Sequence, residues 1–90
     1  MPRVQFVYQA KDVRITKNMA PPERRICDPE SWLRAARKVI PEIPTVDSNW
    51  FILSTDVHAE WITFSLVDSD GNKCAVVIDR TYNNVTNTRL

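Results

Sequence analysis

The chain has 90 residues, of which 43% are hydrophobic and 26% charged, and its formal net charge is +1. This length predicts one domain spanning residues 1–90, and the composition is that of a globular chain, not of a disordered or low-complexity one. No apolar run approaches the roughly 18 residues of a membrane span, so we expect a cytoplasmic domain without a membrane partner.

Charge is distributed unevenly along the chain. Residues 1–40 contain nine Lys and Arg against four Asp and Glu, whereas residues 41–90 contain three against seven. The two segments therefore carry formal charges of +5 and −4. Such polarity can steer a charged partner toward the protein. The overall balance is far from the strongly basic one that is typical of a dedicated nucleic-acid binder.

Two short strands are predicted near the N-terminus. In Val4–Tyr8, apolar and other residues alternate with the period of two that is typical of a half-buried strand. In Asp12–Lys17, two apolar residues lie between charged neighbours, which suits an edge strand. Whether these strands pair with each other is left open. The following segment, Asn18–Cys27, contains consecutive prolines and is predicted to be a loop.

One helix is predicted with defined ends. Asp28 is a suitable N-cap, Pro29 suits the first helical position, and Pro41 disfavours helix at the preceding residue. The helix should therefore end at Ile40. Its apolar residues fall on one arc at about 100° per residue and should pack on a sheet: Trp32, Leu33, Ala35, Ala36, Val39 and Ile40.

Basic residues gather in the loop and on the exposed side of the predicted helix. Together they form a candidate partner-binding patch: Arg24, Arg25, Arg34, Arg37 and Lys38. Guanidinium groups can grip a carboxylate or a phosphate through paired donors. The alternative is that the cations near the helix C-terminus only complement its dipole, at about 0.3 to 1 kcal/mol each.

The stretch from Asn49 to Asp79 predicts three consecutive antiparallel strands. Ser69-Asp70-Gly71 fits a three-residue hairpin loop whose last residue has positive φ, and Gly71 is the only glycine in the chain. That loop pairs Leu66 with Cys74, Phe64 with Val76, and Ile62 with Ile78. A two-residue loop would place these apolar sets on opposite faces.

The first turn of this meander is predicted to be a four-residue loop, residues 56–59, closed by Thr55 and Glu60. This register places Leu53 opposite Ile62 and Phe51 opposite Phe64. Phe51 and Leu53 would then belong to the core face of the sheet. The second face would carry a mixture of polar and apolar residues, with Trp50, Ile52 and Trp61 as its largest apolar members.

This second face is the leading candidate for a binding surface. Two tryptophans beside aliphatic residues can anchor a protein interface or stack unpaired bases. The alternative is that the N-terminal strands or the C-terminal tail fold over the face and bury it. We expect Trp50, Ile52 and Trp61 to bind a partner if the face is open.

No catalytic, metal or cofactor motif is evident. The two cysteines lie 47 positions apart, one histidine has no nucleophile motif near it, and a single glycine excludes a glycine-rich phosphate loop. Asp56, His58 and Glu60 alternate in a hairpin loop, where polar residues are common, and do not by themselves make a metal site. We expect a protein that is not an enzyme and has no cofactor or metal.

The order of a helix followed by a three-strand meander, over Asp28–Asp79, resembles part of the double-stranded RNA-binding domain in architecture. The closing helix of that family would fall after Asp79, where this chain is polar and without helical periodicity, which predicts an irregular tail with a mobile end. No functional residue is carried over from the family.

The sequence as a whole predicts an α+β fold in the order β-β-α-β-β-β, with the helix on an antiparallel sheet. A small domain without motifs and with a two-sided charge distribution also looks like the compact inhibitors that phages and plasmids encode against host machinery. We expect an adaptor or inhibitor that binds another protein. A nucleic-acid-binding module is the alternative, and self-association through a sheet edge is a further one.

Overall fold

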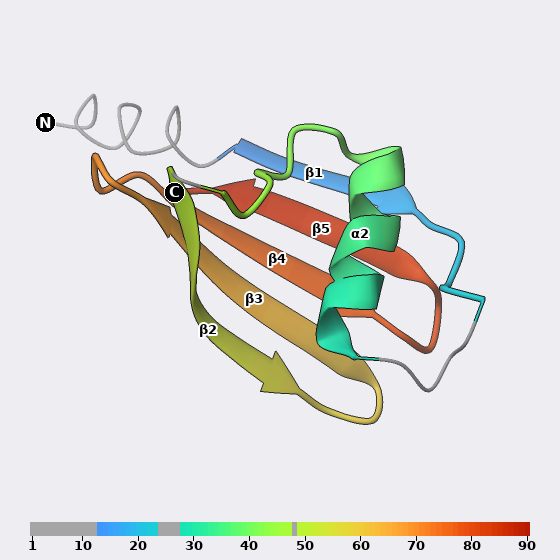
Figure 1. Ribbon diagram of the computed structural model, residues 1–90. Helices are drawn as coiled ribbons and strands as arrows, with labels where there is room; N and C mark the ends of the chain where they lie inside the picture. The colour runs from blue at the N-terminus through green and yellow to red at the C-terminus, as the bar shows by residue number, and fades with distance from the viewer. Residues whose placement is uncertain (1–12, 24–27, 48) are drawn as a thin grey trace, which may run out of the picture.

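The computed structural model describes residues 13–23, 28–47 and 49–90 (Figure 1). One helix lies on a five-stranded antiparallel sheet of order β1-β5-β4-β3-β2. The elements are β1 (Val13–Asn18), α2 (Pro29–Val39), β2 (Trp50–Val57), β3 (Trp61–Asp68), β4 (Lys73–Asp79) and β5 (Asn84–Arg89). The predicted α+β class, with one helix packed on an antiparallel sheet, is confirmed. The strand predicted at Val4–Tyr8 lies outside the described residues.

Helix α2 has the ends that the sequence predicts. The Asp28 Oδ1 atom accepts hydrogen bonds from the Ser31 backbone N–H at 3.2 Å and from the Ser31 hydroxyl at 2.6 Å, so it satisfies a backbone donor of the first turn. These bonds lower the pKa of Asp28. Ile40 is the C-cap, and its N–H still donates to the Ala36 carbonyl. The next residue is proline, which cannot continue this pattern.

The core lies between α2 and one face of the sheet. Its largest fully buried side chains come from the helix, from the loop that follows it and from alternate positions of β3, β4 and β5. They are Trp32, Leu33, Ile40, Ile43, Ile62, Phe64, Leu66, Cys74, Val76, Ile78 and Val85. The predicted apolar arc of α2 is therefore the buried one. Removing this much apolar surface from water is the main stabilising contribution to a small fold.

The β3–β4 hairpin has the predicted register. Leu66 pairs with Cys74, and the two rungs below it follow as expected. Gly71 has a φ of +85°, which is why glycine occupies the end of this loop. The Asp68 carboxylate closes the turn by accepting from the backbone N–H groups of Asp70 and Asn72 at 2.9 and 2.8 Å.

The predicted register between β2 and β3 is wrong. Asp56 and Val57, which were predicted in the turn, belong to β2, so Val57 and not Leu53 pairs with Ile62. The register then shifts by one residue at Leu53, so that Ile52 pairs with Leu66. The extra residue is a β-bulge, which reverses the side-chain alternation on one side of it. As a result, Trp50 and Ile52 pack against the core, whereas Phe51 and Leu53 are exposed.

The segment after Asp79 is a strand, which corrects the prediction of an irregular, mobile tail. Strand β5 pairs with both β4 and β1, so it lies inside the sheet. Asn83, with a φ of +53°, ends the turn that leads into it. Val85 and Asn87 are buried on the helix side of β5. A strand therefore stands where the double-stranded RNA-binding domain has its closing helix.

Among the described residues, no helix is long and apolar enough to cross a membrane.

Candidate protein-binding surface

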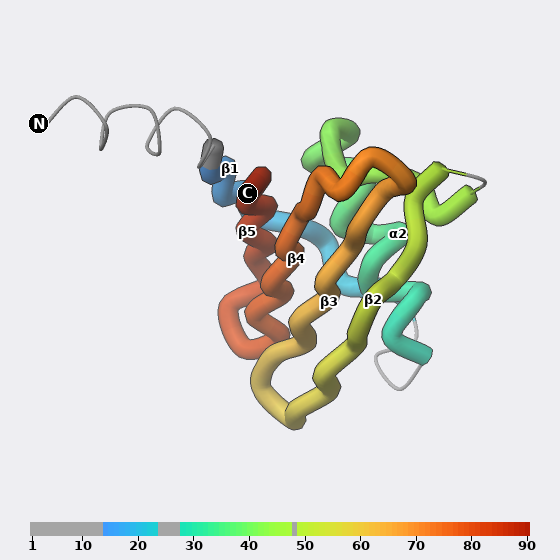
Figure 2. Tube along the Cα trace, turned by 90° about the vertical axis from the view of Figure 1, so that its left-hand side faces the viewer, coloured from blue at the N-terminus to red at the C-terminus, as the bar shows by residue number. Residues whose placement is uncertain are grey.

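The face of the sheet opposite α2, here called the outer face, is covered by no helix or strand of the described chain. Figure 2 shows the helix on one side of the sheet only. The register places the side chains that alternate with the buried ones on this face. Those of the three strands nearest the β2 edge are Phe51, Ser54, Asp56, Trp61, Thr63, Ser65, Val67, Lys73, Ala75, Val77 and Asp79.

Large apolar side chains are exposed on the outer face and at the bulge beside it. Trp61 and Val77 are each 39% exposed, Phe51 is 48% exposed, and Leu53 at the bulge is 66% exposed. Trp61 pairs with Asp79, two residues from Val77, so Trp61 and Val77 are neighbours on the outer face. Phe51 pairs with Val67, six residues farther along β3, and Thr63 and Ser65 lie between the two positions. The exposed apolar residues thus lie at two places, Trp61 and Val77 near the β2–β3 turn and Phe51 and Leu53 near the start of β2.

The rest of the outer face is polar and is held by its own hydrogen bonds. Strands β1 and β5 present Arg14, Thr16, Asn18, Asn84, Thr86 and Thr88 here. The hydroxyls of Thr16 and Thr86 lie 2.9 Å apart, in the middle of this region. The outer face is therefore divided into a polar half over β1 and β5 and a half with exposed apolar side chains toward β2.

Trp61 is held in place at the β2–β3 turn. Its ring stacks on His58, with 3.7 Å between ring centroids and 32° between planes, and the His58 N–H donates to the Trp61 carbonyl at 2.8 Å. Arg80 fixes the same turn from the helix side by donating to the His58 carbonyl at 2.9 Å. Its guanidinium lies 5.3 Å from the centroid of the buried Trp32 ring. A pre-positioned aromatic ring loses little conformational entropy on binding.

The structure does not bring the three predicted face residues together. Trp61 lies on the outer face, but Trp50 and Ile52 are half-buried on the helix side. Phe51 and Leu53, which the sequence pattern predicts to face the core, are exposed in their place. No residue type in β2 signals the bulge, because the strand contains no glycine or proline.

The basic patch is only partly formed by described residues, because Arg24 and Arg25 lie outside them. Arg34 and Lys38 are exposed and line one shallow hollow together with Glu23 and Ser31. Arg37 instead donates two hydrogen bonds, at 3.0 and 2.8 Å, to the Pro44 carbonyl. Its partial burial lowers its pKa. Arg37 therefore fastens the loop after α2 and is not oriented toward a partner.

The described chain holds little that resembles a reactive centre. No group of three or more His, Cys, Asp or Glu side chains in these residues could hold a metal ion. The Cys74 thiol is free and buried, and burial raises its pKa, so it is a poor nucleophile. Cys27 lies outside the described residues.

Comparison with protein families, with characterised proteins and with solved structures found no match to this chain.

Proposed function

We propose that this chain is a small non-enzymatic binding domain, an adaptor or inhibitor that docks on another protein through the apolar half of the outer face. One observation carries the proposal. Trp61 and Val77 are exposed side by side on a sheet face that no described element covers, and Phe51 is exposed on the same face near the other end of β3. An exposed group of large apolar side chains, rimmed by polar ones, is typical of a protein interaction site.

The edge of β2 extends this surface. β2 is an edge strand of the sheet, and the side chains of Leu53 and Val57 are exposed along it. The free backbone groups of an edge strand can pair with an extended segment of a partner, while neighbouring side chains supply specificity. A bulge interrupts the regular ladder at Leu53, which limits such pairing to short segments. In this proposal, apolar side chains of the outer face contribute most of the binding energy, and backbone pairing at the β2 edge orients the partner.

A cytoplasmic location and an origin as a phage- or plasmid-encoded inhibitor belong to the same proposal. The buried, free thiol of Cys74 fits a reducing compartment. The proposed partner is then a component of the cellular machinery, bound without chemical change.

The test is an affinity capture from the source lysate with three baits of equal stability. The first is the wild-type chain, and the second carries Trp61→Ser and Val77→Thr on the outer face. The third carries Arg34→Gln and Lys38→Gln on the helix. We expect one protein that the wild-type and helix baits recover in the presence of nuclease and that the outer-face bait loses. Equal recovery by the first two baits would overturn the proposal.

Nucleic acid is the alternative partner, and the same experiment detects it. Cations that contact phosphates make affinity fall steeply with salt. Recovery that depends on intact nucleic acid and on Arg34 and Lys38 would therefore reject the protein-binding proposal in favour of a nucleic-acid-binding module. Self-association would appear as a doubled mass in light scattering that the outer-face substitutions abolish, and it too would replace the adaptor proposal.

A further inference from the structure

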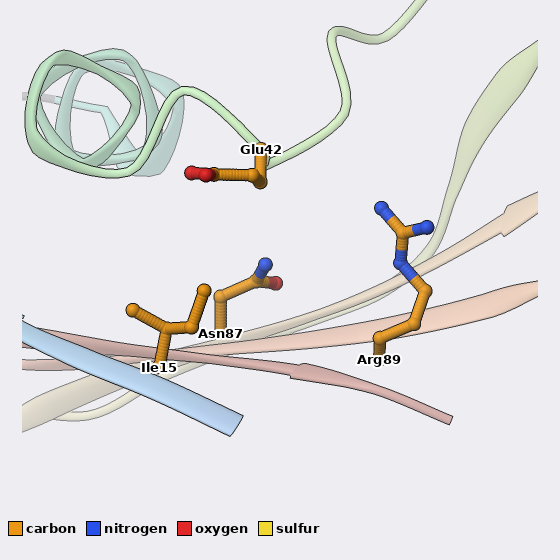
Figure 3. Close-up of a pocket in the computed structure, with 4 residues that line it drawn as sticks. All are labelled: Ile15, Glu42, Asn87 and Arg89. Carbon is orange, nitrogen blue, oxygen red and sulfur yellow. The ribbon is translucent and has the colours of Figure 1, made fainter. Parts of the chain in front are cut away.

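A pocket of about 230 Å³ lies on the helix side of the sheet, away from the outer face (Figure 3). The described residues that line it are Ile15 from β1, Asn87 and Arg89 from β5, and Glu42 from the loop after α2. Ile15 and Asn87 are cross-strand partners, so they form adjacent parts of its floor. Glu42 reaches over this floor from the loop, and Arg89 stands at the other side.

The loop that carries Glu42 is fastened on both sides of it. Ile40 and Ile43 are fully buried, and the Ile43 N–H donates to the Ile40 carbonyl at 3.1 Å. One residue further on, the Arg37 guanidinium holds the Pro44 carbonyl with two hydrogen bonds. The backbone of Glu42 is thereby fixed beside the pocket, and only its side chain remains adjustable.

Asn87 is a polar residue built into the floor. It is only 3% exposed and is the one buried polar residue of the described chain. Its Oδ1 atom accepts from the Cys74 thiol at 2.7 Å. Because the Asn87 side-chain oxygen is already bonded to the Cys74 thiol, the two N–H donors of the same amide remain available to a ligand in the pocket. A buried amide with unused donors at the base of a cavity is suited to a ligand with an acceptor oxygen.

The two charged side chains of the pocket are not engaged with other parts of the described chain. Neither the Glu42 carboxylate nor the Arg89 guanidinium has a hydrogen bond or an ion pair to another described residue. The pocket thus offers one negative group, one forked positive group, an amide donor and an apolar wall. Its volume is below the roughly 300 to 1,000 Å³ of pockets for drug-sized ligands.

We propose that this pocket binds a small zwitterion, an α-amino acid with an apolar side chain, whose ammonium group meets Glu42 and whose carboxylate meets Arg89. The forked donors of arginine match a carboxylate in geometry. The Asn87 amide donates to the same carboxylate, and the apolar side chain lies against Ile15. This site is separate from the outer face, and binding here does not depend on the proposed protein partner.

The test is a titration of the full-length, isotope-labelled chain, followed by amide chemical shifts. The probes are leucine, leucinamide and N-acetyl-leucine. With leucine, we expect saturable shifts at the amides of Glu42, Asn87 and Arg89. Each blocked analogue should bind at least about tenfold more weakly, because each lacks one of the two charges and a lost charge-assisted bond costs about 1.4 kcal/mol or more.

Matched variants assign the contacts. Arg89→Gln and Glu42→Gln should weaken leucine binding at least about tenfold, whereas Arg14→Gln, on the outer face of the neighbouring strand, should not. Absence of saturable shifts with leucine, or equal binding of the three probes by the wild-type chain, would overturn the proposal even if a variant failed to fold. Binding that survives Arg89→Gln and Glu42→Gln unchanged would overturn it as well.

Discussion

Asp68 shows how one exposed side chain fixes a hairpin. Its Oδ1 atom accepts two backbone N–H groups of the β3–β4 turn, and its Oδ2 atom accepts from the Asn72 amide at 2.9 Å. The Asn72 bond is the largest of several contacts that hold the pKa of Asp68 below its ordinary value of 3.8. Hydrogen bonds to the charged form of a carboxyl group favour that form. The turn is therefore most stable when Asp68 is ionised.

The substitution Asp68→Asn should remove this pH-dependent part of the stability. Because the pKa is depressed in the folded state, the contribution is present above about pH 3.8 and is lost as the pH falls through the folded-state pKa. Urea unfolding at a series of pH values should show the wild-type chain to be more stable near neutrality and the difference to shrink in acid. A difference that stays constant across the acid range would contradict this role.

Cys74 should behave as a core residue toward thiol reagents. It is 1% exposed, its thiol donates to Asn87, and burial raises its pKa, so little thiolate is accessible at neutral pH. In a Cys27→Ser variant, we expect the reaction of Cys74 with an aromatic disulfide reagent to be slow in buffer and fast in denaturant. Reaction in buffer at the rate of a free thiol would show that this side of β4 is open.

At the scale of elements, the predictions that succeeded rest on strong local chemistry. The N-cap at Asp28, the proline after Ile40 and the glycine of the β3–β4 turn each restrict the backbone directly. Apolar alternation then identified the buried face of β3 and β4. Strand β5 does not follow from the sequence pattern because its buried positions include Asn87, which breaks the apolar alternation. Its polar residues form a strand only because they pair with β4 on one side and β1 on the other.

The β2 bulge explains the main error at the candidate site. A strand without a bulge would place Ile52 on the outer face and Leu53 on the core face, which is what the sequence pattern predicts. The extra residue at Leu53 reverses the faces of the residues before it, so Ile52 packs against the core and Leu53 is exposed. A bulge is set by how the twisted strand fits its neighbour and the helix, which a pattern within one strand does not contain. The position of Trp61 on the outer face was therefore predictable from the sequence, but the exposure of Phe51 and Leu53 was not.

Two neighbouring substitutions test the bulge. Ile52→Ala should lower the free energy of unfolding by about 1 to 3 kcal/mol, because Ile52 packs against the core. Leu53→Ala should change it by less than about 0.5 kcal/mol, since that side chain is mostly in solvent. Urea unfolding monitored by circular dichroism measures both. A larger loss of unfolding free energy for Leu53→Ala than for Ile52→Ala would contradict the bulge and support a regular register.

At the scale of the whole molecule, the described chain forms two layers, one helix on one sheet. The fully buried side chains among the described residues lie between these layers, and none of the described elements covers the outer face. An antiparallel sheet can leave one face in solvent when that face is polar. Here the half toward β2 carries Trp61, Val77 and Phe51 instead. We interpret this mismatch as a surface kept open for a partner.

The most direct test of the open outer face compares one substitution on the two sides of β4. Val76 is fully buried and Val77 is 39% exposed, and threonine has nearly the shape of valine but adds a hydroxyl. Val76→Thr should cost about 1 to 3 kcal/mol because the hydroxyl loses its hydration in the core, where the neighbouring Asn87 amide replaces at most part of it. Val77→Thr should change the free energy of unfolding by less than about 0.5 kcal/mol. Equal losses at both positions would show that the outer face is covered in the intact chain, and the proposed docking surface would be wrong.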